Sequence, residues 1–285
     1  MGVPISRAPT GVRRIVEGFD ESASAGAALE WAVEEAGLHG ALLEVWAVLD
    51  SPRLSLHPGS NDNEPDLAEL RTAAEHIAKG TGADLRVTQG GAAAVLCETS
   101  EPSDVLVVGS RGRSPLSGLM LGSISRACLR HSPCSVDVFR PARRPPSPHG
   151  RVVVGIDTSR LARRALHIAA GEARLRAAEL DVIHAVQWDQ LHEPDLILPA
   201  TRQMVSWTKS VVDEELAESG VAGHPIVVNG GPGDALVRHS ANADLLVLGS
   251  RGHNPLATLA LGSTSDYCAR HAQCPVMIVR PADHE

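Results

Sequence analysis

Short apolar runs alternate with longer amphipathic segments along the whole chain. In the second half, this pattern predicts strands at 151–156, 179–186, 225–228, 244–248 and 275–279. Helices are predicted between them at 159–177, in a segment ending near 218, at 233–241 and at 263–271. The first half repeats the order from about 13 to 140. Because alternating strands and helices build parallel sheets that are buried on both faces, we predict an α/β fold with a doubly wound sheet in each half.

The sequence also repeats itself residue by residue. The tetrapeptide GSRG at 109–112, followed after nine residues by Gly122 and Ser123, returns at 249–252 with Gly262 and Ser263. Between 104–142 and 244–282, a direct count gives 22 identical residues in 39 positions. Two domains of one fold are therefore predicted at 1–141 and 151–285, joined by the proline-rich linker 142–150.

Composition and charge exclude several classes of protein. The net charge is −8 and the chain has only two lysines, Lys79 and Lys209, which disfavours binding to nucleic acid through its phosphates. Apolar runs fall short of the roughly 18 residues of a membrane span, so we expect no membrane contact. The N-terminus lacks an apolar signal core, which favours a cytoplasmic location.

The five cysteines favour reduced thiols over a disulfide framework. The pairs Cys128/Cys134 and Cys268/Cys274 have no second pair nearby that would complete a tetrahedral metal site. Core packing is the favoured role for these residues, ahead of redox sensing, and no metal site is predicted.

The repeated glycines predict a phosphate-binding loop in each half. Each GSRG follows a buried strand and precedes a helix, where glycine lets the backbone turn sharply and approach a ligand. Ser123 and Ser263 are predicted at the N-caps of those helices, whose unpaired N–H groups attract anions. The motifs of P-loop enzymes, dinucleotide folds, serine hydrolases and zincins are absent from the sequence. The chain is therefore predicted to bind a phosphorylated small molecule.

The signature G-x-x-G-x9-G-S after the fourth strand, and the aspartates Asp20 and Asp157 after the first strands, resemble the tandem form of the universal stress protein family. The resemblance covers almost the whole chain. It implies two open parallel five-stranded sheets of order 3-2-1-4-5 with helices on both faces. It further implies that the last strands of the two halves pair, which makes the chain an intrachain pseudo-dimer and allows a homodimer.

The ATP-binding branch of that family carries this glycine motif. By resemblance, the aspartate after the first strand and a residue near the end of the second contact adenosine, while the glycine loop and its serines hold the phosphates. In the first half these residues are Asp20, Val48, Gly109, Gly112, Gly122, Ser123 and Ser125. In the second half they are Asp157, Ala185, Gly249, Gly252, Gly262, Ser263 and Ser265. The implied cofactor is ATP, with Mg²⁺ arriving on the nucleotide.

The first half departs from the pattern at three positions. Glu17 stands where the second half has Val154, which places a carboxyl group in a strand fit for burial. Ala92 replaces Pro232, and Asp137 replaces Met277 in the last strand. These changes predict that the second half binds nucleotide at least as tightly as the first.

The residues predict a binding protein rather than a catalyst, because the glycine motif supplies a phosphate cradle and little else. The favoured interpretation is an ATP-binding regulator of stress or dormancy that acts on an unknown protein partner, with no catalytic residues. Two alternatives stay open. One is an enzyme, either a slow ATPase or an adenylyl-transfer relative of the fold. The other is an interaction module that works without nucleotide.

Overall fold

A computed structural model describes residues 11–50, 64–112, 121–140, 149–157, 159–186, 194–217, 222–252 and 261–281. The chain divides into two compact units, Met1–Pro141 and Ala142–Glu285. Residues 142–148 of the predicted linker lie outside the described residues. Among the helices that are described, none combines the length and the apolar character needed to cross a membrane.

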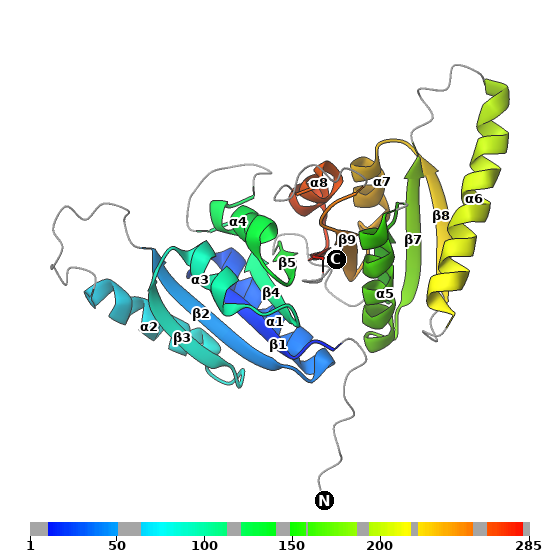
Figure 1. Ribbon diagram of the computed structural model, residues 1–285. Helices are drawn as coiled ribbons and strands as arrows, with labels where there is room; N and C mark the ends of the chain where they lie inside the picture. The colour runs from blue at the N-terminus through cyan, green and yellow to red at the C-terminus, as the bar shows by residue number, and fades with distance from the viewer. Residues whose placement is uncertain are drawn as a thin grey trace, which may run out of the picture. The chain divides into compact units, whose positions relative to one another are not determined.

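Strands and helices alternate in both units, as the sequence predicts (Figure 1). The first unit consists of β1 (Arg14–Phe19), α1 (Ala23–His39), β2 (Leu42–Asp50), α2 (Glu64–Ala78), β3 (Asp84–Gly90), α3 (Ala92–Thr99), β4 (Asp104–Gly109), α4 (Ser123–His131) and β5 (Ser135–Phe139). The second consists of β6 (Arg151–Gly155), α5 (Arg160–Leu175), β7 (Glu179–Val186), α6 (Pro194–Leu216), β8 (Gly223–Asn229), α7 (Pro232–His239), β9 (Leu245–Gly249), α8 (Ser263–His271) and β10 (Val276–Val279). Second-half boundaries fall within about two residues of the predicted ones.

Each unit has the predicted strand order. In the first unit the neighbours run β3-β2-β1-β4-β5, and in the second β8-β7-β6-β9-β10. The pairings within the units, β1 with β2 and β4 and β6 with β7 and β9 among them, are parallel. The α/β fold with a 3-2-1-4-5 sheet in each half is therefore confirmed.

Helices cover both faces of each sheet. In the first unit α3 packs against α4, and in the second α7 packs against α8 while α5 packs against α6 (Figure 1). The central strands are buried between these layers, which explains the apolar runs of β4 and β9. Along β1, the side of Gly18 faces Leu96 of α3, since a Cβ at that glycine would lie 2.7 Å from a Leu96 methyl group. The neighbouring residue Glu17 therefore points to the opposite face, where α1 packs.

Glu17 is a buried acid in the middle of the first sheet. Its side chain is completely buried, and neither carboxyl oxygen has a hydrogen-bond partner among the described residues. Burial, and next the nearby Asp20, raise the pKa of Glu17 well above its usual range. The neighbouring positions across the sheet are apolar, Val45 on β2 and Val107 on β4. The second half places Val154 at this position, where burial costs nothing.

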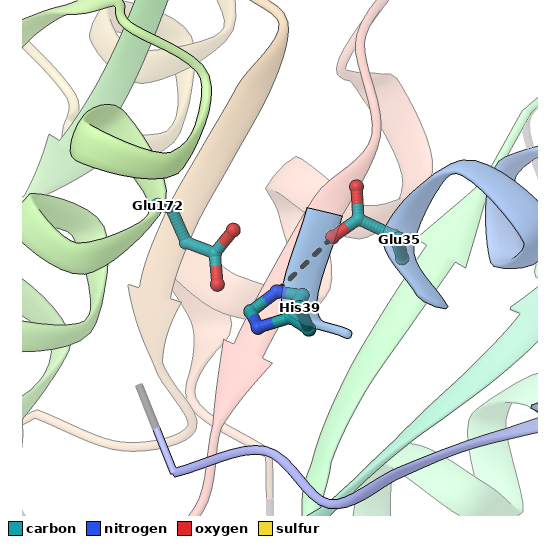
Figure 2. Close-up of side chains that lie close together, drawn as sticks. All are labelled: Glu35, His39 and Glu172. Carbon is teal, nitrogen blue, oxygen red and sulfur yellow. Dashed lines mark ion pairs between the residues drawn. The ribbon is translucent and has the colours of Figure 1, made fainter. Parts of the chain in front are cut away.

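Other buried acids on α1 and β5 have partners. Glu35 and His39 sit one helical turn apart on α1, with 3.5 Å between Glu35 Oε2 and His39 Nε2 (Figure 2). The second half repeats this arrangement on α5, where Glu172 pairs with Arg176. Asp137 accepts a 3.1 Å hydrogen bond from the Trp31 indole. Glu17 is thus the position at which a neutralising substitution has the clearest expected effect.

We expect Glu17→Gln to stabilise the first unit increasingly as the pH rises from about 4.3, the ordinary glutamate pKa. Below that pH both the folded and the unfolded chain hold the proton. Above it the unfolded chain releases the proton while the folded chain retains it, so the wild type loses up to about 1.4 kcal/mol of stability per pH unit until its raised pKa is passed. Urea unfolding between pH 4 and 8, followed by fluorescence, measures the difference.

The matched control is Glu30→Gln, which removes the same charge from an exposed position of α1. Its effect on the free energy of unfolding should stay small and nearly constant with pH. A stability difference between wild type and Glu17→Gln that does not change with pH would contradict the assignment.

Candidate functional site

Both units have a pocket at the carboxyl ends of their central strands. After β1 the chain leaves toward β2, and after β4 it leaves toward β5 on the other side, so the two loops diverge at this point of the sheet. Such switch points are where α/β sheets bind ligands. The pocket has a volume of about 410 Å³ in the first unit and about 500 Å³ in the second.

All the candidate residues predicted from the sequence line these pockets. Those of the first pocket are Asp20, Val48, Gly109, Gly112, Gly122, Ser123 and Ser125. Those of the second pocket are Asp157, Ala185, Gly249, Gly252, Gly262, Ser263 and Ser265. Residues far apart in the sequence therefore meet in each half, as the strand order requires.

The aspartate after the first strand is fixed by the backbone. Asp20 Oδ1 accepts a 3.1 Å hydrogen bond from the N–H of Ser22, and Asp157 Oδ1 accepts one of 2.9 Å from Ser159. The other oxygen, Oδ2, faces the glycine loop: a Cβ added at Gly112 would lie 2.6 Å from Asp20 Oδ2. In the second half, a Cβ added at Gly252 would likewise lie 2.6 Å from Asp157 Oδ2. A side chain at either glycine would have to displace this carboxylate from its position.

Two kinds of helix start face each pocket. The helices α1 and α5 are closed by serine caps, since the hydroxyls of Ser22 and Ser159 accept from backbone N–H groups of their first turns. The helices α4 and α8 begin at Gly122 and Gly262, and neither has a side-chain cap. Their first-turn N–H groups are therefore available to an anion, on which the positive end of the helix dipole also acts.

The prediction that Ser123 and Ser263 are the N-caps is wrong by one residue. The structure places both serines at the first helical position, after the capping glycines. A cap is defined by its backbone conformation, and the extended geometry falls on Gly122 (φ −58°, ψ 157°) and Gly262 (φ −61°, ψ 148°). The consequence is an open helix end instead of one closed by a serine hydroxyl.

Ser125 and Ser265 have a structural role. Their hydroxyls are buried, and each donates a 2.6 Å hydrogen bond to a carbonyl at the end of the fourth strand, that of Gly109 or Gly249. These bonds tie the first turn of α4 to β4, and that of α8 to β9. Both serines still line their pockets.

Gly109 is required by packing as well. A Cβ at this position would lie 2.9 Å from the backbone carbon of Ser24 in α1. In the second half, a Cβ added at Gly249 would lie 3.1 Å from Cγ of Leu161 in α5. The first glycine of the motif therefore lets α1 or α5 approach the sheet, a role that can be seen without any ligand.

The apolar lining differs between the two pockets. Phe19, Trp46 and Ile124 line the first, where Ile156, Ile183 and Thr264 line the second. Further lining residues that the sequence had not assigned to the site are Leu49, Leu70 and Leu96 in the first and Leu236, Leu248 and Leu261 in the second. Helical spacing marks Leu96 and Leu236 as core residues, and no local signal distinguishes a core residue from one that lines a pocket. Glu17 is absent from the described lining of the first pocket, because it lies on the other face of the sheet.

An arginine reaches each pocket. Arg111 and Arg251 follow the first glycine of the motif by two positions and contribute to the linings. Each pocket thus combines an apolar wall, an arginine, one fixed carboxylate and an open helix N-terminus. That combination suits a ligand with a flat apolar part, hydroxyl groups and an anionic end.

Comparisons with known proteins agree with this architecture. Residues 11–140 and 149–280 each match the universal stress protein family. Universal stress protein Rv2623 from Mycobacterium tuberculosis is 30% identical over 290 residues, which cover 93% of this chain and 96% of that protein. Universal stress protein Mb2028c from Mycobacterium bovis is 28% identical over 291 residues, with the same coverage of the two chains.

A solved structure extends the likeness to three dimensions. The crystal structure of a universal stress protein from Archaeoglobus fulgidus superimposes with a TM-score of 0.69 at 25% identity, covering 94% of this chain and 98% of that chain. Because the family is matched twice and the matches span nearly all of the chain, this protein belongs to the universal stress protein family, with two copies of the domain in tandem.

Proposed function

We propose that the chain is a cytoplasmic, ATP-binding regulator of stress or dormancy, with one nucleotide site in each half. The observation that carries the proposal is the pair of uncapped helix N-termini, at Gly122 and Gly262, that face the two pockets. An uncapped N-terminus is a ready site for phosphate, because it presents backbone donors and the positive end of the helix dipole together.

The other walls of the pockets suit an adenosine group. A carboxylate at Asp20 or Asp157 accepts hydrogen bonds from ribose hydroxyls. Trp46 and Val48 in the first pocket, or Ile183 and Ala185 in the second, offer apolar surface to a base. The volumes of about 410 and 500 Å³ lie within the usual range for small-molecule sites.

The residues fit Mg²⁺ that arrives on the nucleotide better than a resident ion. Each described lining holds a single carboxylate, one of whose oxygens already accepts a backbone N–H. Magnesium bound to the phosphates would lower their charge, while Arg111 and Arg251 and the helix N-termini would hold the rest.

The same linings favour binding over turnover. Hydrolysis of ATP needs a group that orients the attacking water, and the one carboxylate in each described lining is turned toward the glycine loop. Slow hydrolysis or adenylyl transfer is the second candidate function. Pairing of the two halves within the chain, a further homodimer and a protein partner remain proposals based on the family.

We expect Gly262→Ser to weaken ATP binding in the second half without destabilising the fold. The site has room, since the nearest atom to an added Cβ, Ser250 O, would lie 3.4 Å away. A serine at an N-cap accepts from the first-turn N–H groups and so competes with phosphate for them. Losing such charge-assisted hydrogen bonds, worth about 1.5–3 kcal/mol each, predicts at least a tenfold loss of affinity. Calorimetry with Mg-ATP should show two sites in the wild type and one strong site in the variant.

Gly37→Ser is the control, because Gly37 is an exposed glycine of α1 with room for a side chain and is absent from the described linings of both pockets. It should leave both sites intact, whereas Gly122→Ser should remove the first site. Wild-type affinity and stoichiometry in Gly262→Ser would contradict the phosphate assignment. A wild-type protein that binds no ATP at millimolar concentration would instead favour the nucleotide-free module.

We also expect ATP to change the fluorescence of Trp46. This residue lies two positions before Val48 on β2 and lines the first pocket, where its indole donates a 3.0 Å hydrogen bond to Glu44. A base held against that ring would alter its emission, while inorganic triphosphate, which lacks a base, would not. Trp46→Phe should therefore lose most of the ATP-dependent change.

Trp207→Phe is the matched control for the fluorescence test. Trp207 lies on α6 of the second half and packs edge-on against His184, with the ring centroids 4.9 Å apart. Its removal should preserve the ATP-dependent change. If Trp46→Phe keeps the full signal while calorimetry shows the first site filled, the base does not lie against Trp46.

A further inference from the structure

The motif residues that line the two pockets differ in type at one position. The glycines, the arginine and the serines of the motif line both pockets and are the same in each half. The exception is Ile124 in the first pocket, which the repeat replaces by Thr264 in the second. Each is the second residue of its helix, α4 or α8. The two halves therefore compare an apolar and a polar side chain at one place in the site.

Thr264 adds a hydrogen-bond donor where Ile124 has none. Its hydroxyl lies in the first turn of α8, whose N-terminus has no side-chain cap, and none of the described residues is hydrogen-bonded to it. A hydroxyl can donate to a phosphate oxygen, and a hydrogen bond to a charged acceptor is stronger than one between neutral groups. The second pocket is thus better equipped than the first to hold phosphate.

The base ends of the pockets differ in the opposite direction. Trp46 and Val48 line the first pocket from β2, where Ile183 and Ala185 line the second from β7. The flat face of an indole can stack on a base, whereas an isoleucine gives only apolar contact. The first pocket therefore has the wall that favours a base, although it lacks the hydroxyl at the phosphate end.

Hydrogen bonds hold the Trp46 ring in place. Glu44 accepts a 3.0 Å hydrogen bond from the indole with Oε2, and its Oε1 lies 3.0 Å from the guanidinium of Arg14. The second half keeps an arginine and an acid at the equivalent positions, with 3.4 Å between Arg151 Nε and Asp181 Oδ2, but an isoleucine follows where the ring would be. Because a side chain that is already fixed loses little freedom on binding, the ring is preorganised in the first half alone.

We propose that the two pockets select adenosine ligands by different parts: the first mainly by the base, through Trp46, and the second mainly by the phosphates, through Thr264. This selectivity rests on the proposed function, because it divides the recognition of one ligand between the two nucleotide sites. Adenosine, which has no phosphate, should bind the first site about tenfold more tightly than the second. The ratio of the dissociation constants for adenosine and ATP should be about tenfold larger at the second site.

Unequal selectivity makes the occupancy of the chain depend on how far the adenosine ligands around it are phosphorylated. When ATP is abundant, both sites hold it. When ATP falls and less phosphorylated ligands accumulate, the first site keeps a ligand while the second empties. Two sites with the same selectivity would empty together and could not report this difference.

Calorimetry on the full chain tests the assignment with three ligands: Mg-ATP, adenosine and inorganic triphosphate. Thr264→Val removes the hydroxyl with little change in volume. It should weaken Mg-ATP and triphosphate at one site about tenfold and leave adenosine unchanged. Trp46→Ile, which installs the residue of the second half, should weaken Mg-ATP and adenosine at the other site about tenfold and leave triphosphate unchanged.

Two conservative variants separate this chemistry from a loss of structure. Thr264→Ser keeps the hydroxyl and should keep the wild-type affinity for Mg-ATP. Trp46→Phe keeps an aromatic ring and should keep most of the affinity for adenosine. The wild type also gives a result without any substitution: adenosine should fill the site that changes the fluorescence of Trp46 at concentrations about tenfold lower than those that fill the other site.

Failure of the selectivity can be told from failure of the proposed function. If the wild type binds ATP but Thr264→Val weakens ATP and adenosine alike, or neither, the selectivity is wrong and ATP binding stands. A Trp46→Ile variant with wild-type affinity for adenosine has the same meaning. A wild type that binds none of the three ligands at millimolar concentration overturns the proposed function and the selectivity together.

Discussion

The close approach of a carboxylate to a glycine loop at the end of two paired strands is the constraint on which the site depends. Parallel pairing of β1 with β4 brings Gly18 level with Val108, so the loops that follow must share one small region. Gly112 permits that sharing, because Asp20 occupies the space where a side chain would project. The second half solves the same problem with Asp157 and Gly252. The strand order therefore determines where the two loops meet, and glycine in the motif allows them to approach each other there.

The same chain closes some helix ends and leaves others open. Ser22 and Ser159 satisfy backbone donors where α1 and α5 begin, whereas Gly122 and Gly262 leave the starts of α4 and α8 without side-chain caps. Exchanging a serine cap for glycine costs only a few tenths of a kcal/mol. An open anion site at a helix start is thus inexpensive in stability, and it is placed in both halves where the carboxylate and the apolar wall also meet.

Periodicity and the internal repeat predicted the order of the elements and the two glycine loops, whereas the strand order and the assignment of the pocket residues came from the resemblance to the universal stress protein family. They could not determine which of Gly122 and Ser123 is the N-cap, because both residue types are favoured there and the backbone decides. Alternation along β1 predicted a buried Glu17 but not its face, which follows from the packing of Gly18 against Leu96. Likewise, the packing role of Gly109 depends on Ser24, a contact between residues 85 positions apart (109 − 24) that no local pattern encodes.

The repeat makes the two halves controls for each other. Where the first half has a hydrogen bond between Trp31 and Asp137, the second has Ile168 and Met277 at the corresponding positions. Because Trp31 and Asp137 hydrogen-bond to each other, replacing both by apolar residues should change the free energy of unfolding little. Glu17 differs, because Val154 fills its position in a sheet of the same topology. A fold that forms with valine at this place does not need an acid there for packing. The buried carboxyl of Glu17 instead makes the stability of the first half depend on pH, an effect that the valine of the second half cannot have.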